Sequence, residues 1–214
     1  MEDSPRPLLR GVFHLYAFYA AVAAGIVLVV LADGLREQLA SWVYGVALAA
    51  MFGASALYHR CPWRSAGVLA WLRRLDHSTI FLFIAGTYTP FALVAFHGTI
   101  GVAVLVAVWA GAAVGLLLNL AWIDAPKWLA ALVYLALGWV AIFTLPQLFS
   151  DVGTASAVLV IVGGGLYTLG AFTYAFRWPD PLPRIFGFHE LFHLLVVAAA
   201  VVQYVAVSRV LLPS

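Results

Sequence analysis

The chain has 214 residues, of which 65% are hydrophobic and 9% are charged, and its mean hydropathy is +1.03. Soluble domains average about 45–50% apolar and about 25% charged residues, so this composition excludes a soluble globular protein and predicts a multi-pass membrane protein. A net charge of +2 gives no reason to expect a nucleic-acid partner, and the single cysteine, Cys61, excludes an internal disulfide and a cysteine-based metal site. Membrane lipids are the expected surroundings, and the sequence indicates no particular protein partner.

Seven apolar windows follow one another along the chain, and each is long enough to cross the roughly 30 Å of membrane hydrocarbon as a helix. They cover residues 12–32, 39–59, 77–96, 99–120, 128–149, 155–176 and 188–210. The windows are continuous rather than alternating, which excludes a transmembrane β-barrel, and only helices then satisfy the backbone in lipid. We therefore predict an all-α bundle of seven transmembrane helices that forms one domain over residues 1–214.

The connections between the windows are short. The longest is predicted from Arg60 to Asp76, so that Asp76 opens the third span. Pro90 and Pro146 fall inside predicted spans and are expected to kink them. Three consecutive glycines at 163–165 in the sixth span permit the close approach of another helix. The first window runs on to a full span without a clear cleavage site, so we expect no cleavable signal peptide.

Positive charges divide unevenly between the two sides of the predicted bundle. Nine of the eleven lysines and arginines fall on one side, namely Arg6, Arg10, Arg60, Arg64, Arg73, Arg74, Lys127, Arg177 and Arg184. Only Arg36 and Arg209 fall on the other side. Since cytoplasmic loops carry the excess of lysine and arginine, we expect a cytoplasmic amino terminus, a carboxyl terminus outside, and a location in the plasma or inner membrane.

Two histidines, His189 and His193, lie four residues apart at the start of the seventh span. Residues at i and i+4 share one face of a helix, so both imidazoles can reach one point. An ionisable side chain inside a membrane is costly without a partner and therefore indicates a functional site. The partner that two neutral imidazoles most often take is a divalent metal ion, above all zinc.

Three further polar residues fall at a matching depth in other spans. His59 ends the second span and Asp76 opens the third, both on the side where the seventh span begins, and Ser55 lies one turn deeper than His59 on the same face. We therefore expect His59, Asp76 and Ser55 to gather around the histidine pair. His14 and His97 occupy other positions and are expected to be unrelated to this site, with His97 at the opposite surface.

These residue types predict a catalytic zinc centre. Three imidazoles and one water give the open tetrahedral coordination of zinc enzymes, in which the metal makes hydroxide available near neutral pH. Asp76 is the expected general base and later acid. Ser55 is expected to support a ligand or to donate a hydrogen bond to a developing oxyanion. Imidazole ligands also suit iron or nickel, so the identity of the metal stays open.

Three other functions fit parts of the same pattern. Residues 189–193 read His-Glu-Leu-Phe-His, the H-E-x-x-H form in which the glutamate, here Glu190, is the base of a metalloprotease. An intramembrane protease would pair this helix with Asp76. A sensor or regulator of membrane state would instead use zinc as a structural clamp. An ion or proton transporter is less favoured, because Asp76 and Glu190 are the only candidate intramembrane carboxylates.

Three ordered motifs resemble those of the hemolysin III family. They are Ser-Ala-Leu-Tyr-His-Arg at 55–60, Leu-Asp-His-Ser at 75–78 with Gly-Thr-Tyr-Thr-Pro at 86–90, and Phe-His-Glu-Leu-Phe-His at 188–193. The family comprises the bacterial members of the progestin and adipoQ receptor superfamily, and its polar core resembles that of alkaline ceramidases.

The resemblance covers all seven predicted spans and implies a role for individual residues. His59, His189 and His193 would bind zinc, Asp76 would hold the zinc-bound water, and Ser55 would be a nearby polar partner. The resemblance further implies hydrolysis of a lipid-like amide or ester, with membrane lipids as candidate substrates.

Overall fold

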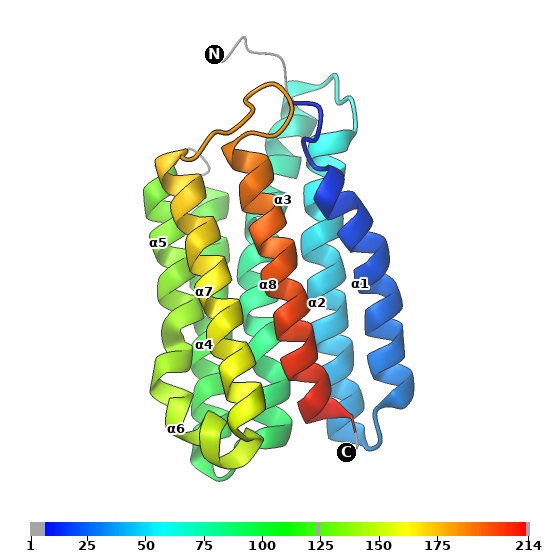
Figure 1. Cartoon of the computed structure of the whole chain (residues 1–214), viewed down its shortest axis with the longest axis vertical. Coiled ribbons are helices and arrows are strands. Elements are labelled where there is room, and N and C mark those ends of the chain that lie inside the picture. The colour runs from blue at the N-terminus through cyan, green and yellow to red at the C-terminus, as the bar shows by residue number, and fades with distance from the viewer. Residues whose placement is uncertain (1–6, 123–124, 213–214) are drawn as a thin grey trace.

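The computed structural model describes residues 7–122 and 125–212, and this part of the chain forms helices and no β-strand (Figure 1). The α-helices are α1 (Val12–Leu31), α2 (Leu35–Arg60), α3 (Ala66–Pro90), α4 (Thr99–Ala121), α5 (Lys127–Gly138), α6 (Leu145–Gln147), α7 (Thr154–Phe176) and α8 (Phe188–Leu211). The π-helical segment η1 (Phe91–Ala95) continues α3. A 3₁₀ segment, η2 (Trp139–Thr144), and a π-helical segment, η3 (Leu148–Val152), flank α6.

Seven helical stretches of the described chain are long and apolar enough to cross a membrane, which confirms the predicted all-α bundle of seven spans. α3 together with η1 makes the third span, and the run from Trp128 to Val152 makes the fifth. The first, fourth, fifth and seventh spans begin at the predicted residues, whereas the second begins four residues and the sixth one residue earlier than predicted. The chain is therefore a multi-pass membrane protein.

The third span begins much earlier than predicted, at Ala66 rather than beside Asp76. Ser65 caps this helix, since its hydroxyl accepts a hydrogen bond from the Val68 N–H at 3.5 Å. The predicted loop is therefore confined to residues 61–65, and Asp76 lies about three turns inside α3. The predicted boundary was wrong because it followed hydropathy alone, and two adjacent arginines lower the hydropathy of the turns before Asp76.

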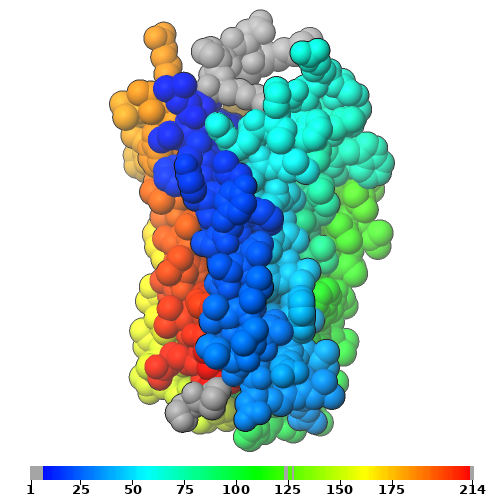
Figure 2. All heavy atoms as spheres, turned by 90° about the vertical axis from the view of Figure 1, so that its right-hand side faces the viewer, coloured from blue at the N-terminus to red at the C-terminus, as the bar shows by residue number. Residues whose placement is uncertain are grey.

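Contacts between the first and last spans close the bundle. α1 packs along α2 and also contacts α8, while α2 packs on α3, α3 on α4, and α7 on both α5 and α8. Figure 2 shows α1 in blue along one face, with α8 in orange and red on one side and α2 in cyan on the other. α1 and α2 approach closely at two glycines, where a Cβ atom on Gly25 would lie 3.2 Å from the Gly45 Cα atom. Segments from both ends of the sequence thus lie side by side.

Both intramembrane prolines coincide with a departure from α-helical geometry. Pro90 is followed directly by η1, and Pro146 stands in α6 between η2 and η3. Proline has no N–H, and its ring clashes with the carbonyl four residues earlier, so an α-helix does not run through it unchanged. The third and fifth spans therefore change their helical pitch where the sequence places a proline.

The two ends of the bundle carry different residues. The starts of α1, α3 and α8 and the end of α2 lie together at the upper end in Figure 1. Arg10 and Arg60 stand next to these helix ends, whereas Arg36 and Arg209 stand at the opposite end. Arg6, which was counted with the first group, lies outside the described residues. The orientation of the two ends relative to the cytoplasm stays a prediction.

Candidate metal centre

Three histidines come together at the upper end of the bundle. His59 is the penultimate residue of α2, and His189 and His193 occupy the first two turns of α8. One potential ligand nitrogen from each imidazole lies within 4.8 Å of the other two. The ring centroid of His59 lies 4.9 Å from that of His189 and 5.1 Å from that of His193, and the latter two are 4.5 Å apart. The fold therefore brings the histidines of two distant segments to one point.

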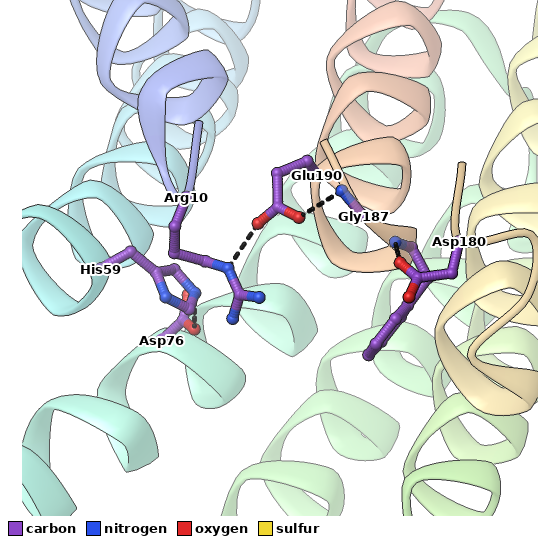
Figure 3. A network of polar contacts seen from close by, with 7 residues as sticks. Arg10, His59, Asp76, Asp180, Gly187 and Glu190 are labelled. Carbon is purple, nitrogen blue, oxygen red and sulfur yellow. Dashed lines mark hydrogen bonds and ion pairs between the residues drawn. The ribbon is translucent and has the colours of Figure 1, made fainter. Parts of the chain in front are cut away.

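A network of hydrogen bonds fixes the start of α8, which carries two of these histidines (Figure 3). The Gly187 N–H donates to Glu190 Oε2 at 2.9 Å, and the Phe188 N–H donates to Asp180 Oδ1 at 2.8 Å. Arg10, which precedes α1, donates from Nε to Glu190 Oε1 and pairs with this fully buried carboxylate. The first N–H groups of a helix have no partner within it, so these acceptors allow the start of α8 to be buried.

Asp76 and Ser55 lie beside the histidines, although Asp76 is farther inside its helix than the sequence predicted. The Asp76 Oδ2 atom is 3.6 Å from His59 Nε2, an ion-pair distance that is too long for a hydrogen bond (Figure 3). Asp76 is 8% exposed and Ser55 is 2% exposed, and both line the same cavity as His189 and His193. The Ser55 hydroxyl has no hydrogen-bond partner among the described residues. Every residue predicted for the site is thus found at one location.

The donor atoms of this cluster fit a metal ion. Within the described chain, His59 Nε2 and His193 Nδ1 are buried without a hydrogen-bond partner. An unsatisfied buried polar group costs about 1–3 kcal/mol, and coordination of a cation would satisfy both nitrogens. Zinc binds imidazole nitrogen at about 2.0–2.1 Å, which places two ligand nitrogens roughly 3.4 Å apart. The observed limit of 4.8 Å is wider, so binding would draw the rings together. Neutral nitrogen donors suit zinc and also iron or nickel.

A cavity of about 290 Å³ extends from the histidines into the bundle. At the upper end its wall includes Ser55, Asp76, His189 and His193, and deeper in the bundle it reaches Gln203. Gln203 lies ten residues beyond His193 on α8, which corresponds to about 15 Å along the helix axis. Most of the remaining wall is apolar or aromatic and comes from α3, α5, α6 and α7. His189 and His193 therefore stand at the polar end of a long apolar cavity, with His59 beside them.

Comparison with protein families matches residues 3–204 to the family described as haemolysin-III related. The chain belongs to this family. The Hemolysin-3 homolog of Bacillus subtilis is 30% identical over 165 residues, which cover 77% of this chain and 74% of that protein. Hemolysin-3 of Bacillus cereus is 31% identical over 172 residues, covering 80% and 75% of the two chains. The heptahelical transmembrane protein ADIPOR2 of Oryza sativa subsp. japonica is 34% identical over 174 residues, covering 74% and 75%. These relatives confirm the haemolysin-III family and its place in the progestin and adipoQ receptor superfamily.

His14, which was not expected to be connected with this site, belongs to it. Its imidazole is 3% exposed, lines the cavity and stacks on His193 with 3.8 Å between the ring centroids. The expectation that His14 is unrelated was therefore wrong. The sequence did carry a signal, because the first and seventh spans start at the same end and His14 stands in the first turn of its span. His97, in contrast, is exposed in the connection before α4 at the other end, as expected.

Glu190 follows His189 directly, but its carboxylate is used elsewhere. Oε2 accepts the Gly187 N–H and Oε1 pairs with Arg10, so both oxygens are bound. Glu190 is not part of the cavity wall formed by the described residues. A general base has to come within hydrogen-bond reach of the proton that it removes, whereas this glutamate holds the start of a helix. The glutamate of the H-E-x-x-H sequence thus stabilises the start of α8. This role makes a metalloprotease function less favoured.

Proposed function

We propose that this haemolysin-III protein is a zinc-dependent membrane hydrolase that cleaves a lipid-like amide or ester. The observation that carries the proposal is the position of three imidazoles beside a buried carboxylate at the end of a long apolar cavity. An apolar cavity with a few convergent polar groups suits a ligand that has a hydrocarbon chain and one polar functional group. The surrounding membrane is the expected source of such a substrate.

His59, His189 and His193 hold the zinc ion in this proposal. When bound, zinc supplies a Lewis acid that makes water nucleophilic at neutral pH. The carboxylate of Asp76 accepts a proton from the attacking water and then donates it to the leaving group. The hydroxyl of Ser55, which lines the cavity without a partner in the described chain, donates a hydrogen bond to the oxygen that gains negative charge. The apolar wall keeps bulk water away from the bond that is cleaved.

The metal content of the protein, purified in detergent without chelator, tests the first part of the proposal. We expect about one zinc ion per chain in the wild type, because three imidazoles from two helices form one coordination site. The His59→Ala and His193→Ala variants should both lose it, since each removes a ligand from a different helix. A wild type without metal, or two variants that retain it, would contradict the proposed site.

The Asp76→Asn variant tests the catalytic part, because it keeps the size of the side chain and removes the proton acceptor. We expect its turnover of a panel of lipid amides and esters to fall by about 10²–10⁴-fold, the usual contribution of a general base. Its zinc content should stay at the wild-type level, since the three imidazoles remain. Unchanged turnover in Asp76→Asn would reject the role given to Asp76.

A second function, a sensor or regulator of membrane state, uses the same metal as a structural clamp. The observation that favours it is that the candidate ligands join α2 to α8, two helices from opposite ends of the chain. A structural ion stabilises the fold by its binding energy, so chelation would lower the melting temperature strongly. A strong shift without turnover of any lipid amide or ester would favour the sensor, and the absence of a shift would remove it.

A further inference from the structure

The stack between His14 and His193 has a geometry that restrains one proposed ligand. The two imidazole planes differ by only 9° and their centroids are 3.8 Å apart, so the rings lie face to face. The Phe52 ring meets His14 edge-on at 5.0 Å. Neither nitrogen of His14 has a hydrogen-bond partner among the described residues. The rings of His193 and Phe52 therefore hold the imidazole of His14 between them.

The segment before α1 is anchored to α8, the helix that carries His193. Arg10 pairs with the buried carboxylate of Glu190 (Figure 3). The N–H groups of Leu8 and Leu9 donate to the carbonyl oxygens of residues 184 and 185, just before α8, each at 3.2 Å. These contacts fix the start of α1 relative to the start of α8.

The same segment also packs against His59, the candidate metal ligand on α2. Gly11 has a φ of +73°, in the left-handed region, and a Cβ atom on it would lie only 2.6 Å from the Cβ atom of His59. A side chain at this position would push His59 away, so the close approach requires glycine. His14 follows one turn later. The segment from which it projects is thus held against both helices that carry the candidate ligands, α2 and α8.

We propose that His14 is a positioning residue of the metal centre, which holds the imidazole of His193 in the plane needed to bind the ion. The inference rests on the proposed metal site. A parallel ring at 3.8 Å blocks rotation of the His193 imidazole, because turning it would drive its edge into His14. A ring that is already held loses less conformational freedom when the metal binds, which raises affinity.

The same geometry shows that His14 is not itself a ligand of the ion that His193 binds. The lone pairs of an imidazole lie in the plane of its ring, and a metal ligand therefore binds the ion edge-on. His14 presents its flat face to His193, and their nearly parallel planes are separated by the stacking distance. One ion cannot lie in both planes at once, so His14 acts through His193.

Metal binding by the full chain in detergent tests this role, with Zn²⁺ for affinity and Co²⁺ as a spectroscopic probe of ligand geometry. His14→Phe keeps a flat ring and removes both nitrogens, whereas His14→Ala removes the ring. We expect His14→Phe to retain the wild-type zinc affinity and Co²⁺ absorption. We expect His14→Ala to bind zinc about 10–100-fold more weakly, the usual cost of losing a residue that orients a ligand, and to change the Co²⁺ absorption.

Three outcomes would overturn the inference. Wild-type affinity and absorption in His14→Ala would remove the positioning role and leave the metal site intact. An equal loss in His14→Phe and His14→Ala would assign the effect to the nitrogens of His14 instead of its ring. A wild type that binds neither ion would overturn the positioning role together with the proposed metal site, so the two failures are distinguishable.

Two further variants separate positioning from general packing. Phe52→Leu removes the ring that meets His14 edge-on and removes no ligand, so it should lower the melting temperature of the metal-free protein and weaken zinc binding less than His14→Ala does. If His14→Ala does not fold, His14→Leu takes its place, because leucine fills the space without a flat ring and is expected to lose zinc affinity in the same way. A loss of affinity in Phe52→Leu equal to that of the His14 variants would contradict the inference.

Discussion

Glu190 and Asp76 are both buried carboxylates near the histidines, yet their neighbours give them different roles. Both oxygens of Glu190 are bound, one by the Gly187 N–H and one by Arg10. Asp76 contacts His59 at 3.6 Å and borders the cavity. The sequence suggested a catalytic role for either residue, because the pairing of Glu190 with Arg10 joins opposite ends of the chain and leaves no local pattern.

Replacing Glu190 by glutamine separates these roles. The Glu190→Gln variant should lose about 1–3 kcal/mol of unfolding free energy, because it removes the charge that Arg10 pairs with. The side chain of Arg10 is 23% exposed, so water recovers part of the loss. Turnover of the lipid substrate per folded molecule should stay at the wild-type level. Thermal unfolding and turnover, measured side by side, check this; complete loss of turnover with zinc retained would instead identify Glu190 as the base.

Gly11 offers a second prediction for a single residue. Gly11→Ala places a side chain in left-handed backbone, at a cost of about 1–2 kcal/mol, and its Cβ atom would lie 2.6 Å from the Cβ atom of His59. We expect the displaced His59 to weaken zinc binding by at least about tenfold. The measurement is zinc affinity in competition with a chelator.

Gly98 provides the matched control for Gly11. Its φ of +66° is similar, but it lies at the other end of the bundle, and a Cβ atom there would meet nothing within 4 Å. Gly98→Ala should therefore destabilise the backbone at least as much as Gly11→Ala, because its ψ of −143° lies outside the left-handed helical region and close to one that almost only glycine adopts, and it should leave zinc affinity unchanged. Equal zinc affinity in the two variants would mean that contact with Gly11 does not place His59.

Among the secondary-structure elements, hydropathy predicts most of the spans and misses one boundary. Four spans begin where the apolar windows begin, because lipid-exposed helices have to be apolar around most of their circumference. α3 differs, since Arg73 and Arg74 interrupt its apolar residues before Asp76, and the helix starts from the Ser65 cap. The cap is visible in the sequence, but a search for apolar residues gives it no weight. Asp76 was consequently placed at the correct end of the bundle but on the wrong part of its helix.

The sequence predicted those residues of the candidate site that can be recognised from their depth within a span. His59, Asp76 and the histidine pair were recognised because all fall at or near the ends of the predicted apolar windows on one side. The contact of His14 with His193 depends on α1 packing against α8, and the order of helices around a bundle is a tertiary property that hydropathy does not contain. A rule based on depth alone, applied equally to every histidine, would have included His14.

The three glycines at 163–165 of α7 differ in ways that the sequence did not distinguish. A Cβ atom on Gly163 would lie 2.7 Å from the Gln203 Nε2 atom of α8, and that amide is held by a hydrogen bond of 3.2 Å to the Val160 carbonyl. A Cβ atom on Gly165 would meet nothing within 4 Å. The predicted close approach thus concerns one glycine of the run.

Alanine at these two glycines should therefore have opposite effects on stability. Gly163→Ala overpacks the contact with Gln203 and should destabilise the protein by about 1–3 kcal/mol. Gly165→Ala should be neutral or stabilise it by up to about 1 kcal/mol, because alanine is the better helix former. Thermal unfolding in one detergent compares the pair, and a destabilised Gly165→Ala would show a contact that the structure lacks.

For the whole molecule, the uneven distribution of arginine supports one orientation in the membrane. The end that carries the histidines also carries most of the cations, and the other end carries Arg36 and Arg209. We propose that the histidine-bearing end faces the cytoplasm, because cytoplasmic connections retain positive charge during insertion. A lipid substrate would then meet the site from the inner leaflet.

The single cysteine allows this orientation to be measured in cells. Cys61 follows α2 at the histidine-bearing end and is partly exposed. A maleimide that does not cross membranes should fail to label the wild type in intact cells and should label it after permeabilisation. Asp33→Cys in a Cys61→Ser background moves the thiol to the exposed connection between α1 and α2 and should be labelled in intact cells. The reverse pattern would mean that the orientation is inverted.

The contacts between the first and last spans also bear on how the protein is made. The ribosome delivers the helices in chain order, so α8, with two of the candidate ligands, is the last to enter the membrane. Until then His14 lacks its stacking partner, Arg10 lacks its carboxylate, and α2 offers one imidazole alone. The proposed ion can therefore be held by all three imidazoles only after α8 has joined the bundle, and its uptake would mark chains in which the first and seventh spans have come together.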